Sequence, residues 1–370
     1  MLHIETALNL IILLPSHCCS HGIIIIEHMS PVNLFGYTFT ELKAVTEALN
    51  LPGYTSHQLS DWLYRKNAAS FDQMSNLSKE TRKKLSDNYI LSKPLPIKVQ
   101  VSGDGTKKYL FPARVDKSIE SVYIPEKNRN TLCISAQVGC TMDCVFCMTG
   151  KQGFQGNLTA GEIINQIASL PERDLLSNIV FMGMGEPLAN TDNVIKSIDI
   201  MTSAYGFGWS PTRITLSTVG MLPGLEKVIQ ETRCHLAVSL HSPFDEERRS
   251  LMPVEKIYPI KEVVALLKKS QLKRQRRISF EYIMFRDLND SMRHVNGLTR
   301  LLNGLKCRIN LIRFHEIPDT PLRSSSDETI LRFKNRLNEK GMLTTIRASR
   351  GQDIFAACGM LSTIHNRQDQ

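Results

Sequence analysis

The chain has 370 residues, of which 42% are hydrophobic and 22% are charged. This composition excludes a disordered chain, and the length suffices for one large domain and one small one. A formal net charge of +9 suggests a polyanionic partner such as nucleic acid, although many basic proteins bind none. Nine cysteines, three of them closely clustered, indicate a reducing compartment, so we expect a cytoplasmic protein.

The first 28 residues differ from the rest of the chain. They hold two short apolar runs, at residues 8–14 and 23–26. Neither run reaches the roughly 20 apolar residues that a membrane span needs, and no basic segment precedes them as in a signal peptide. We therefore expect no membrane association. Our hypothesis is that translation starts at Met29 and that residues 1–28 are a disordered extension.

Residues 29–95 have the apolar spacing of a small helical domain. The spacing predicts helices over residues 39–49, 56–66 and 79–88. Basic side chains decorate these helices. On these residues alone a solvated helical face is the favoured interpretation, and an RNA-binding accessory domain is the functional one.

A β-rich connector is predicted for residues 96–130. Residues 96–101, 107–113 and 118–124 are strand-like, and Ser-Gly-Asp-Gly-Thr at 102–106 predicts a hairpin turn.

From residue 131 onward, short β-branched runs alternate with helix-length segments. The predicted strands cover residues 131–138, 178–182, 213–217, 235–239, 278–284 and 308–314, with a last extended run at 343–348. Such alternation favours a parallel sheet flanked by helices. We predict an α/β fold, a partial (β/α)6 barrel over residues 131–361, followed by a tail at 362–370.

Polar or glycine-rich residues follow the predicted strands, and the chemistry of such barrels gathers at the carboxyl ends of the strands. The segments concerned are residues 183–187, 217–220, 239–241, 315–316 and 350–358. Any one of these segments could be a turn, but together they converge on one rim.

The most informative motif directly follows the first strand. Cys140, Cys144 and Cys147 stand in a C-x3-C-x2-C spacing. Iron–sulfur clusters are held by cysteine thiolates, normally one per iron, so three cysteines leave one iron of a four-iron cluster for another ligand. Structural zinc, which usually takes four ligands, is a weaker interpretation. Cys133 as a fourth ligand of a ferredoxin-like cluster is a minor alternative.

The motif, with Phe146 before its third cysteine, resembles the radical S-adenosylmethionine (SAM) enzymes, in which SAM chelates the open iron. A Gly-Glu-Pro turn at 185–187, Ser-Leu-His at 239–241 and Ala-Ala-Cys-Gly at 356–359 make the likeness more specific. Together these segments closely resemble the RlmN/Cfr family of radical SAM RNA adenine methylases, over residues 31–361.

The resemblance implies a [4Fe–4S] cluster on the cysteine triplet and two SAM molecules per turnover. It implies SAM contacts from Gly185, Glu186, Ser217, Ser239, Leu240, His241 and His315. His315 departs from the family, because many relatives carry Asn at this position. A histidine there can still donate or accept a hydrogen bond.

The resemblance also implies three catalytic residues. Cys358 would take a methyl group from one SAM and, after loss of a hydrogen atom to a radical made from the second, would add it to the base. Cys133 would release the product by forming a disulfide with Cys358, while Glu120 removes the proton from the base carbon. Without the resemblance, both cysteines would be interpreted as small buried apolar residues.

The implied substrate is an adenosine of 23S rRNA and, for the RlmN branch, the adenosine 3′ of certain tRNA anticodons. A base that reacts inside a barrel must leave its stack, so looped RNA is expected. A basic run at residues 268–277 could follow the RNA backbone. We expect a monomer that methylates C2 and takes electrons from a donor such as flavodoxin or ferredoxin. Methylation of C8, as in the Cfr branch, is the alternative. A radical SAM enzyme acting on another substrate and a non-enzymatic iron–sulfur protein remain open.

Overall fold

The computed structural model describes residues 32–113, 116–270 and 276–363. The expectations for residues 1–28, for most of the 362–370 tail and for the middle of the basic run at 268–277 lie outside these residues.

The predicted N-terminal helices are present. They are α1 (Phe39–Ala48), α2 (Thr55–Ser60) and α3 (Lys79–Asn88), and α2 continues into a single π-helical turn at Asp61–Arg65. A capping box starts α1, because Thr38 and Glu41 satisfy each other's backbone amides. Two short parallel strands, β1 (Val32–Asn33) and β2 (Tyr89–Ile90), join the two ends of this module.

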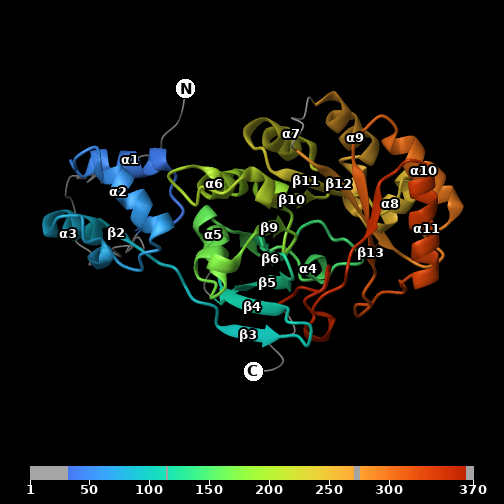
Figure 1. Ribbon diagram of the computed structural model, residues 1–370, viewed down its shortest axis with the longest axis horizontal. Coiled ribbons are helices and arrows are strands. Elements are labelled where there is room, and N and C mark those ends of the chain that lie inside the picture. Colours follow the sequence, from blue (N-terminus) through green and yellow to red (C-terminus); the bar gives the residue numbers. More distant parts are fainter. Residues whose placement is uncertain (1–31, 114–115, 271–275, 364–370) are drawn as a thin grey trace, which may run out of the picture.

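The N-terminal module packs directly against the rest of the molecule (Figure 1). Gly36 has φ +103°, and a Cβ atom added to it would lie 2.3 Å from the backbone nitrogen of Gly161. The two backbones therefore approach too closely for any side chain. Lys196 pairs with Glu41 across the same contact at 2.6 Å, so the module has a fixed position.

One ten-stranded sheet dominates the structure, in the order β14-β13-β12-β11-β10-β9-β6-β5-β4-β3. Its strands are β3 (Lys98–Val101), β4 (Lys107–Pro112), β5 (Ser118–Glu126), β6 (Arg129–Cys133), β9 (Asn178–Phe181), β10 (Ile214–Thr218), β11 (His235–Ser239), β12 (Ile278–Met284), β13 (Arg308–Arg313) and β14 (Thr344–Ile346). The strands from β6 to β14 in this sheet are parallel, and β5, β4 and β3 extend it as an antiparallel meander.

Helices follow the parallel strands and cover the outside of the sheet (Figure 1). They are α5 (Ala160–Ala168), α6 (Thr191–Thr202), α7 (Leu222–Glu231), α8 (Asp245–Leu251), α9 (Ile260–Lys269), α10 (Met292–Leu302) and α11 (Asp327–Glu339). Short 3-10 turns lie at Phe71–Gln73, Arg173–Leu175, Pro187–Asn190, Pro211–Arg213, Pro253–Lys256 and Gln352–Ile354. The predicted partial barrel is confirmed.

The structure differs from the prediction in two places. The predicted strand at 131–138 breaks after Cys133, where the chain reaches the rim of the sheet. Its remainder forms β7 (Gln137–Val138), which pairs with β8 (Gly156–Asn157), and α4 (Met148–Lys151) lies in the loop that they enclose. Strand β6 also begins at Arg129, two residues inside the predicted connector, and the connector strands continue the main sheet because β5 pairs with β6.

Within the described part of the chain, no helix combines the length and the apolar character that crossing a membrane requires.

Candidate active site

Two adjoining cavities occupy the inside of the partial barrel. The larger, of about 770 Å³, follows the inner face of the parallel strands. The smaller, of about 160 Å³, lies at their carboxyl ends. Six residues line both: Met182, Glu281, Ile312, Arg347, Cys358 and Leu361. The two cavities therefore meet at these side chains.

The cysteine triplet lines the smaller cavity. Gly139 starts this loop with φ +70°, and a Cβ atom there would lie 1.7 Å from the carbonyl oxygen of Gly153. Only glycine fits, and the backbone then turns so that Cys140 enters the cavity. The amide of Cys147 donates to the carbonyl of Cys144 at 3.0 Å, which places the last two thiols on one tight turn.

The surroundings of the triplet fit an iron–sulfur cluster. Burial raises the pKa of Cys140 to about 12, raises that of Cys144 well above the value of a free thiol and also raises that of Cys147. Cys147 and Cys140 raise the pKa of Cys144 further. A bound cation would stabilise the thiolates. Among the described residues, no three acidic, cysteine or histidine side chains converge as ligands of a single ion. Three cysteines in one loop match an iron–sulfur cluster that keeps one iron open, whereas structural zinc usually takes four ligands.

Glu186 ties two strand ends together beside this cavity. Its carboxylate accepts hydrogen bonds from the amide of Leu188 (2.9 Å), the hydroxyl of Thr218 (2.6 Å) and the amide of Val219 (2.9 Å). Burial raises its pKa, while these three donors lower it. The side chain thus fixes the turn after β9 against the end of β10. Glu186 also lines the smaller cavity, where its expected contact with SAM would be made.

The other expected SAM residues at this rim line the smaller cavity, with one exception. Gly185, Ser217, Ser239 and His241 all reach it. Gly185 has φ +88°, and an added Cβ atom would lie 2.4 Å from the Cβ atom of Gln137, so the close approach requires glycine. Leu240 is fully buried and does not line the cavity.

His241 is held in one orientation and one tautomer. Its Nδ1 accepts the amide hydrogen of Ile283 at 3.0 Å, and Asn289 donates to its carbonyl at 2.7 Å. Burial lowers the pKa of His241 to about 3, so the ring is neutral and the proton lies on Nε2. The ring also packs edge-on against Phe146, with centroids 4.8 Å apart. His241 can therefore donate one hydrogen bond at the cavity.

His315 lies elsewhere. It lines the larger cavity and not the smaller one, and its Nε2 is 3.0 Å from the hydroxyl of Ser349. Burial and the nearby Arg313 lower its pKa. His315 is therefore separated from the other expected SAM residues, which line the smaller cavity.

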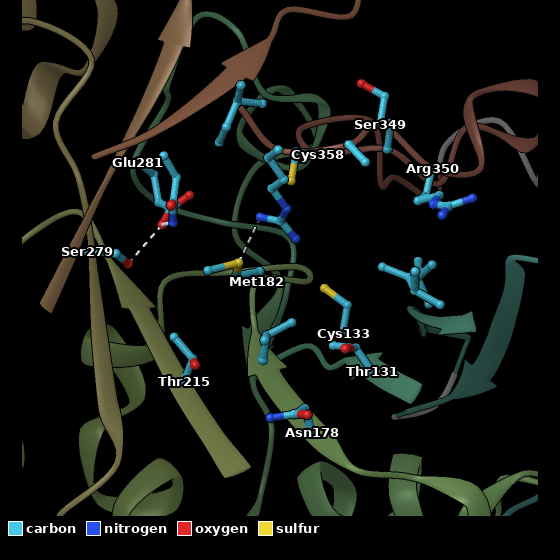
Figure 2. Close-up of a pocket in the computed structure, with 18 of the residues that line it drawn as sticks. Thr131, Cys133, Asn178, Met182, Thr215, Ser279, Glu281, Ser349, Arg350 and Cys358 are labelled. Atoms are coloured by element: carbon cyan, nitrogen blue, oxygen red, sulfur yellow. Dashed lines mark hydrogen bonds between the residues drawn. The ribbon is translucent and has the colours of Figure 1, made fainter. Parts of the chain in front are cut away.

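Cys133 and Cys358 lie on the wall of the larger cavity, and Cys358 also reaches the smaller one (Figure 2). Burial raises the pKa of Cys133 to about 12, and the neighbouring Cys358 raises it further. The fold thus brings together two cysteines that stand far apart in the sequence. Cys358 occupies the junction between the cluster cysteines and the larger cavity.

Glu120 is near this junction but not in it. Its carboxylate pairs with Lys108 at 3.0 Å and accepts the amide of Ser362 at 3.0 Å, and it lines neither cavity. Ser362 follows Cys358 closely in the chain. Glu120 therefore lies behind the C-terminal segment that carries Cys358.

Arg347, which lines both cavities at the same junction, was not predicted from the sequence. It donates to the sulfur of Met182 at 3.1 Å (Figure 2). The pKa of Arg347 is raised chiefly by Cys358, and Glu281 and Cys133 add to the effect. The positive charge of Arg347 lowers the pKa of Cys133, against the larger effect of burial. A single arginine after a short strand has no distinguishing pattern in the sequence.

Arg248 was also missed. Its guanidinium donates to the carbonyls of Val219 (2.8 Å) and Ser239 (3.0 Å), and it forms a buried ion pair with Glu255. These carbonyls lie at the ends of β10 and β11. Arg248 thus holds two strand ends that line the smaller cavity.

The segment that carries Cys358 is anchored at both ends. The carboxylate of Asp353 accepts the hydroxyl of Ser102 (2.5 Å) and the amide of Gly103 (3.1 Å), both in the hairpin between β3 and β4. On the other side, the amide of Met148 donates to the carbonyl of Gly359 at 2.8 Å. Gly359 has φ +81°, and a Cβ atom there would lie 2.9 Å from the carbonyl oxygen of Phe146.

Comparison with known proteins agrees with this geometry. Residues 134–295 match the model of the radical SAM superfamily, and residues 32–91 match the ribosomal RNA large subunit methyltransferase N-terminal domain. A crystal structure of a radical SAM methyltransferase from Sphaerobacter thermophilus superimposes with a TM-score of 0.83 at 39% identity, covering 90% of this chain and 99% of that chain. The fold and the site define a radical SAM enzyme.

Two relatives narrow the assignment. A Parabacteroides distasonis protein named "Probable dual-specificity RNA methyltransferase RlmN" is 54% identical over 90% of this chain and 97% of its own length. The "Dual-specificity RNA methyltransferase RlmN" of Syntrophus aciditrophicus is 43% identical over 90% of this chain and 97% of its own length. The chain belongs to the RlmN family of radical SAM RNA methyltransferases, and the predicted resemblance is confirmed.

Proposed function

We propose that the protein methylates C2 of a specific adenosine in 23S rRNA and C2 of the adenosine 3′ of the anticodon in some tRNAs. The observation that carries the proposal is the position of Cys358, which reaches both the cavity of the cluster cysteines and the cavity that contains Cys133. A residue that carries the methyl group from SAM to the base must reach both of these cavities. The RlmN-named relatives do not favour C8 methylation.

Cys140, Cys144 and Cys147 would hold a [4Fe–4S] cluster, and Gly185, Ser217, Ser239 and His241 would hold SAM next to it. Bound there, the cluster and SAM would supply a 5′-deoxyadenosyl radical when one electron arrives. The neutral His241 offers one Nε2 hydrogen to the ligand, and the glycine at 185 lets backbone amides approach it.

Cys358 would act first as a nucleophile. Its thiolate attacks the methyl group of one SAM, the S–CH₃ bond forms and S-adenosylhomocysteine leaves. Arg347 would place its positive charge beside this sulfur, which is the largest cause of the raised pKa of Arg347. Loss of one hydrogen atom from this methyl group to a second SAM-derived species leaves a carbon radical on Cys358, which adds to C2 of adenine. This accounts for two SAM molecules per turnover.

Cys133 would release the product. The adduct radical would return one electron to the oxidised form of the electron donor, and its C2 proton would pass to Glu120. The Cys133 thiolate then attacks the sulfur of Cys358, so that the S–S bond forms, the C–S bond breaks and the methyl carbon takes a proton. A two-electron reductant restores both thiols. Glu120 is paired with Lys108 behind the C-terminal segment, so this role requires the segment to move away from it.

The proposal includes the partners of the reaction. RNA is the substrate, flavodoxin or ferredoxin supplies electrons, and the enzyme acts as a monomer. The free cysteines of the described chain need a reducing compartment, which supports the cytoplasm as the site of action.

The test is an anaerobic reaction of the cluster-loaded protein with reductant, SAM and unmodified 23S rRNA fragment or tRNA. Mass spectrometry against C2 and C8 standards identifies the methyladenosine. We expect 2-methyladenosine, which disappears in Cys358→Ala and persists in Cys307→Ala, a control thiol that lines neither cavity. An 8-methyladenosine product, or SAM cleavage without any methylated RNA, would refute the proposal.

A further inference from the structure

A group of basic side chains surrounds the end of the larger cavity that lies opposite the cluster cysteines. Arg129, His235 and Arg308 are the first residues of β6, β11 and β13, and Arg277 directly precedes β12. All four line the larger cavity. We call them the basic mouth. Since these strands are parallel, the basic mouth lies at the amino-terminal edge of the barrel.

Among the described residues, the hydrogen bonds and ion pairs involve none of the three guanidinium groups of the basic mouth. Arg129 interacts electrostatically with Glu126. One carboxylate, Glu126, also lines this end, and it faces Arg129 across the β5–β6 hairpin. Three guanidinium groups against one carboxylate leave this end of the cavity with a net positive charge among its described lining residues.

His235 shows how closely these charges approach one another. Burial lowers its pKa to about 4, together with the charges of Arg277, Arg276, Arg308 and Arg129, of which Arg276 lies outside the basic mouth. Arg129 belongs to β6, three strands away in the sheet order, where a flat sheet would separate the two by roughly 14 Å. The curvature of the sheet brings its charge nearer.

The neutral ring of His235 adds a hydrogen-bond donor. Its Nδ1 accepts the amide of Arg277 at 3.0 Å, so the proton lies on Nε2. The site thus combines three cations and one neutral donor. These groups suit a phosphate, because each guanidinium group can donate two parallel hydrogen bonds to its oxygens and the neutral His235 can donate without gaining a proton.

The cavity connects this site with the reactive cysteines. Its lining continues along the inner face of the strands to Cys133, Cys358 and Arg347. From Arg129 to Cys133 the strand β6 advances four residues, which is roughly 13 Å. This is the scale of one nucleotide extruded from its stack, with a phosphate at one end and the base at the other.

We propose that the basic mouth binds the phosphates that flank the target nucleotide, so that the RNA enters the barrel from its amino-terminal edge and the base reaches Cys358 through the larger cavity. This inference rests on the proposed function, because it requires an RNA substrate. It adds a phosphate site remote from the cluster cysteines, and it fixes the direction from which the RNA approaches.

The test compares two triple variants of the full chain. Arg129→Gln/Arg277→Gln/Arg308→Gln removes the charges of the basic mouth. Arg249→Gln/Arg300→Gln/Arg332→Gln removes the same charge from exposed positions of α8, α10 and α11 and serves as the control. Fluorescence anisotropy with a labelled 23S rRNA hairpin gives the dissociation constant at several salt concentrations.

We expect the mouth variant to bind the hairpin at least about tenfold more weakly near physiological salt, and the slope of log affinity against log salt to be smaller by about 2. The control variant should resemble the wild type. SAM affinity and the absorbance of the iron–sulfur cluster should be unchanged in both variants, since the mouth lies at the far end of the cavity.

A second measurement locates the contact on the RNA. Replacing the phosphates on either side of the target adenosine with neutral methylphosphonates should weaken binding to the wild-type protein and should have little further effect on the mouth variant. If the two losses add in full, the mouth does not contact these phosphates and the inference is wrong.

The inference also fails if the mouth variant binds the hairpin with the affinity and salt slope of the wild type, or if the control loses as much. Weakened binding of inorganic phosphate alone, with unchanged RNA binding, would identify a small-anion site and overturn it too. These results differ from a failure of the proposed function, in which the wild-type protein itself would not methylate RNA.

Discussion

The buried ion pair between Arg248 and Glu255 offers a direct test of how the rim of the smaller cavity is held. Both side chains are almost inaccessible to solvent. Arg248 also donates to the carbonyls of Val219 and Ser239 at 2.8 and 3.0 Å, while Glu255 accepts the amide of Ile260. Arg248→Met would remove the charge and both carbonyl contacts while keeping an unbranched apolar side chain.

The expected loss of unfolding free energy follows from the charged group that each substitution leaves buried. Glu255 would stay buried without its cation, and such a loss typically costs 3–5 kcal/mol, so we expect about 4 kcal/mol of unfolding free energy. The two orphaned carbonyls belong to this same loss, since a buried acceptor without a partner is itself unfavourable. Glu255→Met should cost about as much, because it leaves a buried guanidinium.

The double variant separates pairing from packing. Arg248→Met/Glu255→Met leaves no buried charge, so it should be no less stable than either single variant, with a coupling free energy of about 3 kcal/mol or more. Anaerobic urea unfolding, followed by circular dichroism, gives the three free energies. SAM affinity, measured by equilibrium dialysis, should fall in every variant that lacks Arg248, because the ends of β10 and β11 lose their common partner.

Two outcomes would refute this reasoning. If each single variant loses less than about 1 kcal/mol, the pair is not desolvated as the structure indicates. If the two single losses add in the double variant, the side chains act independently. Unchanged SAM affinity in Arg248→Met would show that the rim keeps its geometry without this residue.

Three further predictions concern other parts of the site. Asp353→Asn weakens the hydrogen bond between the segment that carries Cys358 and Ser102 of the hairpin. Limited proteolysis near Cys358 should therefore become faster and methylation about tenfold slower. Proteolysis and methylation rates equal to those of the wild type would contradict the prediction. Glu281→Gln keeps the oxygen that accepts hydrogen bonds from Ser279 and Asn310 and replaces the buried Oε2, which has no hydrogen-bond partner among the described residues. Activity should fall at least tenfold, while the free energy of unfolding should stay within about 1 kcal/mol of the wild type. A parallel loss of activity and stability would indicate a purely structural role. The pKa of His241 is about 3 in the folded state and 6.5 in the unfolded chain, so below pH 6.5 the unfolded chain binds a proton that the folded protein does not. This residue should therefore lower the free energy of unfolding by about 1.4 kcal/mol for each pH unit below 6.5. His241→Gln should reduce the pH slope by that amount in urea titrations of cluster-free protein, and an unchanged slope would contradict the assignment.

Much of the fold could be read from local patterns. The cysteine spacing, the hairpin turn at 102–106 and the alternation of strands and helices all depend on neighbours in the sequence, where side-chain type and backbone preference act directly. The positions of Gly185, Ser217, Ser239 and His241 at the rim could be predicted for the same reason, since each lies at or just after the carboxyl end of a strand whose direction the alternation defines. The end of the strand at Cys133 could not be predicted, because it depends on where the tertiary structure places the rim of the sheet.

What the sequence determined by itself, then, is the chemistry available: three thiols at cluster spacing, a glycine-rich turn beside them and two further cysteines. The tertiary structure alone decided which groups meet. It placed Cys358 at the junction of two cavities, put Arg347 beside it, kept Glu120 outside the cavity and moved His315 away from the smaller one. The physical reason is that these contacts depend on the curvature of the sheet and on the return path of the C-terminal segment, which packing across the whole barrel fixes and no local sequence pattern records.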